Sequence, residues 1–323
     1  MVLTLGEALV AITPTAPVTL DRARALVPRV GGAELNFAIG LRRLGVPAAW
    51  LGRLGADSLG EVVLRQLEAE GVDTRWVVRD AERCTGVYFR EWLADGDRRP
   101  FYYRAGSAAS AASPADWPED LPDVRWLHVS GITMALGEGP ARLVEHAVAW
   151  ARERAIPVSF DPNHRTALWS EDRARAALRR IAERATVLMM SHEEAELLFG
   201  SDDHRACTER AHELGVETVV VKRGAHGALG SAGGVVVESP PGEVERVVDP
   251  VGAGDGFDAA LVAALLAGSP LGPALELANH VGARAVEDVG EHPYPTTAAL
   301  PEQLRRVLEP EPAAPHVPKE ASA

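Results

Sequence analysis

Short apolar strands and amphipathic helices alternate along most of the chain. Residues 2–12 are apolar and partly β-branched apart from Gly6 and Glu7, and they predict a buried first strand. Residues 33–44 repeat apolar positions at helical spacing and end before Gly45, which predicts a helix. Further strands are predicted over 49–54, 126–129, 158–161, 187–190 and 218–222, and further helices over 57–70, 140–154, 171–183, 193–199, 256–267, 273–286 and 297–308. This alternation with short connections predicts an α/β fold, a mostly parallel, doubly wound sheet flanked by helices.

Some stretches do not fit this alternation. They are short, half polar and hairpin-like, and cover residues 18–30, 86–93 and 100–104, the last two around the turn composition Asp95-Gly96-Asp97. They predict a small separate β-sheet, inserted near residues 15–30 and 86–104.

The rest of the chain shows no sign of a second domain. Residues 235–237 and 244–248 predict an antiparallel continuation of the main sheet. No internal repeat or shift in composition divides the chain, so one domain is expected over residues 1–309. Residues 310–323 are rich in Pro, Ala and charge without periodicity, which predicts a disordered tail.

Composition narrows the classes of function. The 323 residues are 46% hydrophobic and 24% charged, with a net charge of -13. A nucleic-acid surface needs clustered Lys and Arg, so this charge argues against one. The two cysteines, Cys84 and Cys207, have no metal-ligand spacing and fit a reducing compartment. No stretch approaches the roughly 20 apolar residues of a membrane span and no signal-peptide pattern begins the chain, so a cytoplasmic protein without membrane contact is expected.

The chemistry is concentrated between Asp249 and the apolar run that follows Asp255. Gly252, Ala253 and Gly254 lead into a helix, and the first backbone N–H groups of a helix can bind an anion without side chains. A carboxylate beside such an anion hole repels phosphate, so Asp255 is better suited to act as a general base in phosphoryl transfer. The alternative is an ordinary capping Asp after a glycine turn.

This stretch resembles the signature of the ribokinase-like (phosphofructokinase-B) sugar kinases, although Pro250 stands where that family usually has Thr. The resemblance implies a ribokinase-like fold, ATP and Mg²⁺ as cofactors, and Asp255 as the catalytic base. It also implies that the inserted strands form a lid over the sugar, where water must be excluded because it would otherwise accept the phosphoryl group. Gly31 and Gly32 would approach the sugar, with Asn36 as donor and acceptor for its hydroxyls.

Other segments are more similar to the 2-keto-3-deoxygluconate kinase branch of this family than to ribokinases or fructokinases. They are residues 31–36, 102–104, 161–169 and 193–200. The similarity implies a sugar-acid site made of Gly32, Ala33, Glu34, Leu35, Asn36, Tyr88, Tyr102, Tyr103, Arg104, Ile132, Arg165 and Asp255, with Glu291 as a further candidate. The planar fork of arginine suits a carboxylate, so Arg104 and Arg165 favour an acidic sugar, with Arg165 on its carboxylate. The alternative for each arginine is a surface ion pair.

The nucleotide is expected at the carboxyl end of the sheet, where ligands of open α/β sheets bind. Residues 222–227 form a glycine loop after a Val-rich strand that resembles the ATP loop of the family, although alone such a loop is a common hairpin. The expected contacts are Asn163, His164, Arg165, Lys222, Arg223, Gly224, Ala225, His226, Gly227, Gly252, Ala253, Gly254 and Asn279. Glu194 is the candidate for organising Mg²⁺ through water, with a solvated helix cap as its alternative.

These features lead to one hypothesis and three alternatives. The hypothesis is an ATP-dependent kinase that converts 2-keto-3-deoxygluconate to 2-keto-3-deoxy-6-phosphogluconate, with Asp255 as base and the amides of residues 252–254 as anion hole. The alternatives are a kinase for a neutral sugar such as fructose or ribose, a non-catalytic sugar-binding homologue, and a nicotinamide oxidoreductase. The last lacks its Gly-x-Gly-x-x-Gly fingerprint. Exposed lid strands also predict a homo-oligomer paired through the lid.

Overall fold

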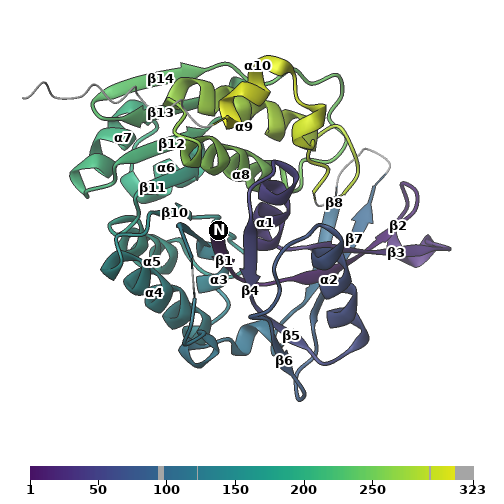
Figure 1. Ribbon diagram of the computed structural model, residues 1–323. Coiled ribbons are helices and arrows are strands. Elements are labelled where there is room, and N and C mark those ends of the chain that lie inside the picture. Colours follow the sequence, from purple (N-terminus) through teal and green to yellow (C-terminus); the bar gives the residue numbers. More distant parts are fainter. Residues whose placement is uncertain (94–97, 122, 291, 310–323) are drawn as a thin grey trace, which may run out of the picture.

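A computed structural model describes residues 1–309 apart from 94–97, 122 and 291 (Figure 1). Among these residues the main sheet has the strand order β14-β13-β12-β11-β10-β9-β1-β4. Its strands are β1 (Val2–Leu5), β4 (Ala48–Leu51), β9 (Trp126–Ser130), β10 (Val158–Asp161), β11 (Val187–Ser191), β12 (Thr218–Lys222), β13 (Ala228–Ala232) and β14 (Val235–Ser239). Neighbouring strands along β4-β1-β9-β10-β11-β12 pair in parallel. At the other edge of the sheet, β13 pairs antiparallel with both β12 and β14. The predicted mostly parallel, doubly wound sheet is confirmed.

Helices cover both faces of this sheet (Figure 1). On β11, Val187 and Met189 point into one apolar core while Leu188 and Met190 point into the other, so both faces must be covered. One core is closed by α1 (Ala33–Arg43), α2 (Ser58–Ala69), α8 (Ala253–Leu266) and α9 (Leu271–Ala285), and the other by α4 (Glu138–Glu153), α5 (Glu171–Ala182), α6 (His192–Phe199) and α7 (His204–Glu213). In the described part of the chain, no helix is long and apolar enough to cross a bilayer.

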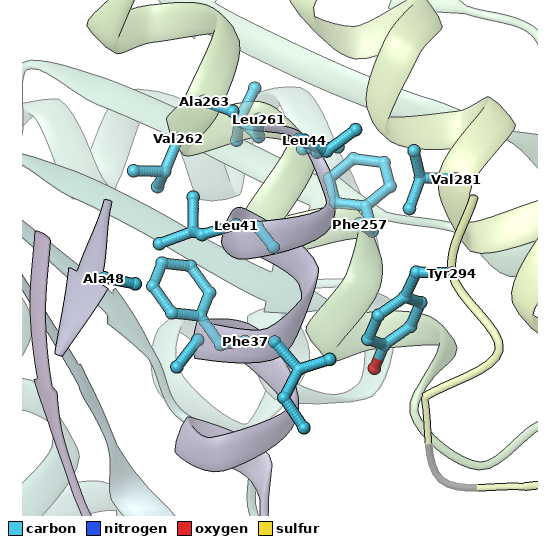
Figure 2. Close-up of a cluster of buried hydrophobic side chains, with 14 of the residues drawn as sticks. Phe37, Leu41, Leu44, Ala48, Phe257, Leu261, Val262, Ala263, Val281 and Tyr294 are labelled. Atoms are coloured by element: carbon cyan, nitrogen blue, oxygen red, sulfur yellow. The ribbon is translucent and has the colours of Figure 1, made fainter. Parts of the chain in front are cut away.

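The packing of α1 on α8 places the N-termini of two helices beside each other. Figure 2 shows Phe37 and Leu41 of α1 and Phe257 and Leu261 of α8 in one cluster of apolar side chains, and all four side chains are buried. Burying a side chain of this size contributes about 1.5–3 kcal/mol, so this contact holds the two helices firmly. It also fixes the residues that come just before it on each helix, Asn36 and Asp255.

A second sheet, called the lid below, contains β2 (Leu9–Pro14), β3 (Leu26–Gly31), β7 (Gly86–Trp92) and β8 (Arg98–Tyr103) in the order β3-β2-β7-β8. The prediction of one strand over residues 2–12 is wrong, because the chain leaves the main sheet after β1 and continues as β2 of the lid. The prediction of hairpin strands within 18–30 is also wrong in part. That stretch supplies β3 alone, which pairs with β2.

Other boundaries also differ from the prediction. Residues 244–248 form no strand. The antiparallel continuation of the main sheet is instead made by β13, which was not predicted, and β14. Residues 49–54 divide between β4 and β5 (Arg53–Gly55), which pairs with β6 (Val78–Asp80). Pro301 interrupts the expected last helix and leaves α10 (Glu302–Arg305) between 3-10 turns. The expected turn at residues 95–97 and the tail at 310–323 lie outside the described residues.

Candidate active site

A cavity of about 820 Å³ lies between the lid and the carboxyl ends of the main strands. Asp161, Ser191 and Lys222 line it from the ends of β10, β11 and β12. Tyr88 and Tyr102 line it from the lid, and residues 250–252 from the turn before α8. The position agrees with the rule that open α/β sheets bind ligands at the carboxyl ends of their strands.

Asp255 is in the first turn of α8 and lines this cavity. Its Oδ2 accepts a hydrogen bond of 2.8 Å from Nδ2 of Asn36, which fixes the carboxylate in direction. Burial raises the pKa of Asp255 to about 6, with Asp161 also raising it and Asn36, Arg165 and Lys222 opposing the rise. A carboxylate with this pKa is ionised at neutral pH and is a stronger base than an ordinary Asp.

The turn before α8 brings backbone amides to the lining of the cavity. Gly252 is the N-cap with φ of 79°, a left-handed conformation that favours glycine. The amide of Ala253 is used within the turn, because it donates to the carbonyl of Pro250 at 3.3 Å. Within the described residues, the amides of Gly252 and Gly254 have no hydrogen-bond acceptor, and both residues line the cavity. These two amides, with the positive end of the helix dipole, can stabilise an anion.

Lys222 lies directly behind this turn. Its Nζ is 3.1 Å from Oδ2 of Asp161 and 3.0 Å from Oδ2 of Asp258. Burial alone would lower the pKa of Lys222, but the two carboxylates outweigh burial and raise it, so the ammonium stays charged. A Cβ placed on Gly254 would be 3.8 Å from this ammonium. Lys222 thus places an ammonium near the start of α8, where two carboxylates offset its charge.

The two predicted arginines both line the cavity, but only Arg104 is in an ion pair. Arg104 is buried and forms an ion pair with Glu7, whose pKa is raised by burial to about 7. Arg165 is exposed; its carbonyl accepts from the amide of Leu168 at 2.9 Å, and in the described part of the chain its guanidinium has no ion-pair or hydrogen-bond partner. The guanidinium of Arg165 is thus free for an acidic ligand.

The comparison with known proteins now identifies the fold and reaction class. Residues 1–297 match the pfkB family of carbohydrate kinases. The chain belongs to this family. It is 33% identical to a 2-dehydro-3-deoxygalactonokinase of Haloferax volcanii over 310 residues, which is 94% of this chain and 95% of that protein. It is 34% identical to a 2-dehydro-3-deoxygluconokinase of Bacillus subtilis over 265 residues, 81% of this chain and 82% of that protein.

Solved structures of similar proteins have the same fold. A PfkB protein from Polaromonas sp. is 36% identical, with a TM-score of 0.83 over 88% of this chain and 95% of that one. A putative ribokinase II from E. coli, solved in complex with ATP and Mg²⁺, is 30% identical, with a TM-score of 0.84 over 90% and 94% of the two chains. The fold is thus ribokinase-like and the protein is a carbohydrate kinase, which excludes the nicotinamide oxidoreductase alternative.

Most residues expected at the kinase site line the cavity. Besides those described above, they are Gly32, Ala33, Ile132, Asn163, His164, Glu194 and Gly224. The glycine at position 32 also has a packing role, because a Cβ there would lie 2.2 Å from the backbone oxygen of Glu7. Glu291 lies outside the described residues.

Several other expected residues do not line this cavity. Glu34 and Leu35 are fully buried on the inner side of α1, where Thr133 donates to Glu34 at 2.5 Å. Tyr103 points to the opposite face of β8 from Tyr102 and is 67% exposed. The expectation that these three side chains contact the sugar does not fit this geometry.

The nucleotide-site expectations need similar correction. Asn279 is buried and donates to Oγ of Ser239 at 3.0 Å, so it holds the loop after β14. Arg223 pairs with Glu238 on the surface of the sheet edge. The remaining expected residues that the structure places outside the cavity lining are Ala225, His226, Gly227 and Ala253.

The lid contributes arginines that the sequence analysis missed. They are Arg90, two residues after the expected Tyr88 on β7, and Arg98, four residues before the expected Tyr102 on β8, and both line the cavity together with the expected Arg104. The period of two along a strand puts such residues on one face, so this alternation was the available signal. The other missed lining residues are Leu9, Pro100, Asp161, Thr166, Ser191, His192, Glu193, Pro250 and Val251.

Glu194 is the expected metal-organising residue of the kinase. Its Oε1 accepts from the amide of His164 at 2.7 Å and its Oε2 from that of Ser191 at 2.8 Å, so it also caps α6. Among the described residues, no group of three or more His, Cys, Asp or Glu side chains can hold a metal ion. Glu194 lines the cavity, and a Mg²⁺ ion organised by it would take most of its ligands from phosphates and water, as Mg²⁺ commonly does.

Proposed function

We propose that this carbohydrate kinase transfers the γ-phosphoryl group of ATP to the primary hydroxyl of 2-keto-3-deoxygluconate, giving 2-keto-3-deoxy-6-phosphogluconate. The observation that supports this most is the presence, in one cavity, of the base Asp255, the anion-binding turn and the unpaired guanidinium of Arg165. The names of the Haloferax and Bacillus relatives agree with a keto-deoxy sugar acid as substrate.

In this reaction Asn36 holds the carboxylate of Asp255 toward the sugar, at the 2.8 Å hydrogen bond described above. Asp255 accepts the proton of the primary hydroxyl while the hydroxyl oxygen forms its bond to the γ-phosphorus and the bond to the leaving ADP oxygen breaks. The amides of Gly252 and Gly254 stabilise the charge that spreads over the phosphoryl oxygens. Binding and preorganised charge carry the catalysis, because phosphoryl transfer needs little covalent help from the protein.

Two arginines are suited to hold the acid, Arg165 after β10 of the main sheet and Arg104 after β8 of the lid. Arg165 makes two parallel charge-assisted hydrogen bonds with the sugar carboxylate. Arg104, kept in place by Glu7, faces the same cavity beside Tyr102. Tyr88 and Tyr102 cover the apolar part of the sugar chain and exclude water, which would compete with the sugar as acceptor.

ATP is proposed to lie along the carboxyl ends of β10 to β12, against Asn163, His164, Lys222 and Gly224. The E. coli relative solved in complex with ATP and Mg²⁺ supports this choice of nucleotide and metal. Glu194 would hold Mg²⁺ through water, and the ion would neutralise charge on the nucleotide phosphates.

The test is ADP release in a coupled assay with a panel of sugar acids and neutral sugars. Wild-type protein is expected to prefer 2-keto-3-deoxygluconate or its galactose epimer to fructose or ribose. Arg165→Leu is expected to lower kcat/KM for the acid by about 10- to 100-fold, the value of a charged hydrogen bond, and to leave any activity on fructose unchanged. Arg173→Leu, an exposed change on α5, is the matched control.

Two results would contradict this function. Preference for a neutral sugar, with Arg165→Leu lowering both activities equally, would favour the neutral-sugar kinase. Sugar binding without ADP release from any substrate would favour the non-catalytic homologue.

We also propose that the lid pairs subunits. Its edge strands β3 and β8 expose apolar side chains, namely Leu26, Val27, Phe101 and Tyr103. Such edges are open to pairing with a second chain. Light scattering is expected to give at least twice the chain mass of 34.4 kDa, and a monomer at all concentrations would contradict the proposal.

A further inference from the structure

Two lid arginines are tied to the first residue of the catalytic turn. Arg90 of β7 pairs with Asp249, 159 residues away, with Nη2 at 2.9 Å from Oδ2 and Nη1 at 3.4 Å from Oδ1. The side chains are 4% and 0% exposed. Arg98 of β8 adds its Nε at 3.9 Å from Oδ2 of Asp249, and its Nη2 donates to the carbonyl of Val248 at 3.3 Å. Both β7 and the edge strand β8 thus contact residues 248–249.

Asp249 in turn shapes the anion-binding turn. Its Oδ1 accepts from the amide of Val251 at 3.3 Å, one residue before the N-cap Gly252. A shift of Asp249 therefore moves the segment whose amides face the phosphoryl group. Since a misplacement of about 1 Å can cost about 100-fold in rate, this segment must be held accurately.

The same lid face that touches the turn also covers the sugar side of the cavity. Tyr88 and Arg90 alternate on β7, and Arg98 and Tyr102 alternate on β8, all lining the cavity. Strands transmit displacement along their length because their backbones are extended and paired. The position of Tyr88 and Tyr102 over the sugar and that of the arginines on Asp249 are thus coupled.

Stability alone does not account for this pair. Apolar side chains of similar volume often stabilise a fold as much as a buried ion pair does, because forming the pair costs the desolvation of both charges. A buried charge pair between two structural parts is instead specific in geometry, since a guanidinium and a carboxylate fit in one arrangement.

We propose that Arg90 and Arg98 are positioning residues that align the anion-binding turn when the lid covers the sugar. This inference rests on the proposed function, because it needs a sugar substrate beneath the lid. It makes phosphoryl transfer depend on lid closure through Asp249.

The first test is a split between kcat and KM. Arg90→Gln is expected to lower kcat by about 100-fold while KM for the sugar acid changes by less than about threefold, and Arg90→Lys is expected to regain about tenfold of the loss. Arg99→Gln is the matched control on the outer face of β8, where its side chain is 61% exposed, and is expected to keep wild-type kcat. Equal kcat for Arg90→Gln and wild type would overturn the proposal.

A double variant separates alignment from folding. Arg90→Gln leaves the buried carboxylate of Asp249 with only Arg98, whose Nε is 3.9 Å away, and can unfold the protein. Arg90→Gln with Asp249→Asn instead replaces the close pair by two neutral groups that can still hydrogen-bond. This double variant is expected to unfold near the wild-type temperature yet keep a kcat loss of about tenfold or more. Recovery of full kcat together with stability would show a merely structural pair and overturn the proposal.

Hydrogen exchange followed by mass spectrometry reads the coupling without turnover. In wild type, adding 2-keto-3-deoxygluconate is expected to slow exchange both in residues 86–92 of the lid and in residues 249–256. In the double variant it is expected to slow exchange in the lid alone. Equal slowing of the turn in both proteins would overturn the coupling. No slowing anywhere in the wild type would contradict the proposed function, and the coupling with it.

Discussion

Replacing Asp255 by Asn is expected to make the protein more stable and nearly inactive. Burial raises the pKa of this carboxyl from 3.8 to about 6, so the folded state disfavours its charged form. The penalty is absent below pH 3.8, grows between pH 3.8 and 6, and is complete above pH 6. At 1.36 kcal/mol for each pKa unit, its upper limit is about 3 kcal/mol.

The neutral amide removes this penalty and keeps the hydrogen bond from Asn36, because its oxygen is still an acceptor. That bond loses its charge assistance, so the net gain in unfolding free energy is expected to be about 1–3 kcal/mol at pH 8 and close to zero near pH 4. Turnover is expected to fall by about three orders of magnitude or more, the upper part of the range for loss of a general base.

Urea unfolding at the two pH values and ADP release at pH 8 measure both effects on one preparation. Asp202→Asn, an exposed change beyond the cavity, is the control and is expected to alter neither quantity. A variant that loses stability equally at both pH values would refute the burial argument. A variant that keeps turnover within tenfold of wild type would refute the role of Asp255 as base.

Further predictions concern the groups around this carboxylate. Because only ionised Asp255 accepts a proton, kcat/KM measured by ADP release is expected to fall tenfold per unit of pH below about 6, and a flat profile would contradict this. Gly252→Ala forces φ of 79° on a residue with a Cβ and is expected to cost about 1–2 kcal/mol in urea unfolding. Gly254→Ala has room at a helical position, so it is expected to keep that stability and lose turnover in the same assay. Lys222→Met leaves Asp161 and Asp258 without their cation, and urea unfolding is expected to show a loss of about 3–5 kcal/mol; unchanged stability would contradict the buried-cation role.

The fold was predictable where local pattern and tertiary structure agree. Strands and helices that alternate from β9 to β12 predicted the parallel part of the sheet, because each strand is short, mostly apolar and buried on both faces. The pattern did not show where the chain changes sheets. Residues 2–5 and 9–14 are both largely apolar, and the separation of β1 from β2 depends on which distant strands each one pairs with.

The site was predictable where chemistry is local in sequence. Asp255 and its glycines adjoin one another, so their relation to a helix start was readable, and the structure adds the bond from Asn36. The ion pair of Arg90 with Asp249 was not readable, since charged residues so far apart show no local sign of pairing or burial. The prediction that Asn279 contacts the nucleotide does not fit the structure for a similar reason, because the hydrogen bonds of Asn279 at the end of β14 depend on tertiary packing.

The most direct measurement is identification of the product formed from 2-keto-3-deoxygluconate and ATP, by phosphorus–proton correlation in nuclear magnetic resonance. One phosphomonoester on the terminal carbon, formed in equal amount to ADP by wild type and not detected with Asp255→Asn in the same time, is the expected result. ADP accompanied only by inorganic phosphate, or the same ester formed as fast by Asp255→Asn, would contradict a sugar-acid kinase that uses Asp255 as its base.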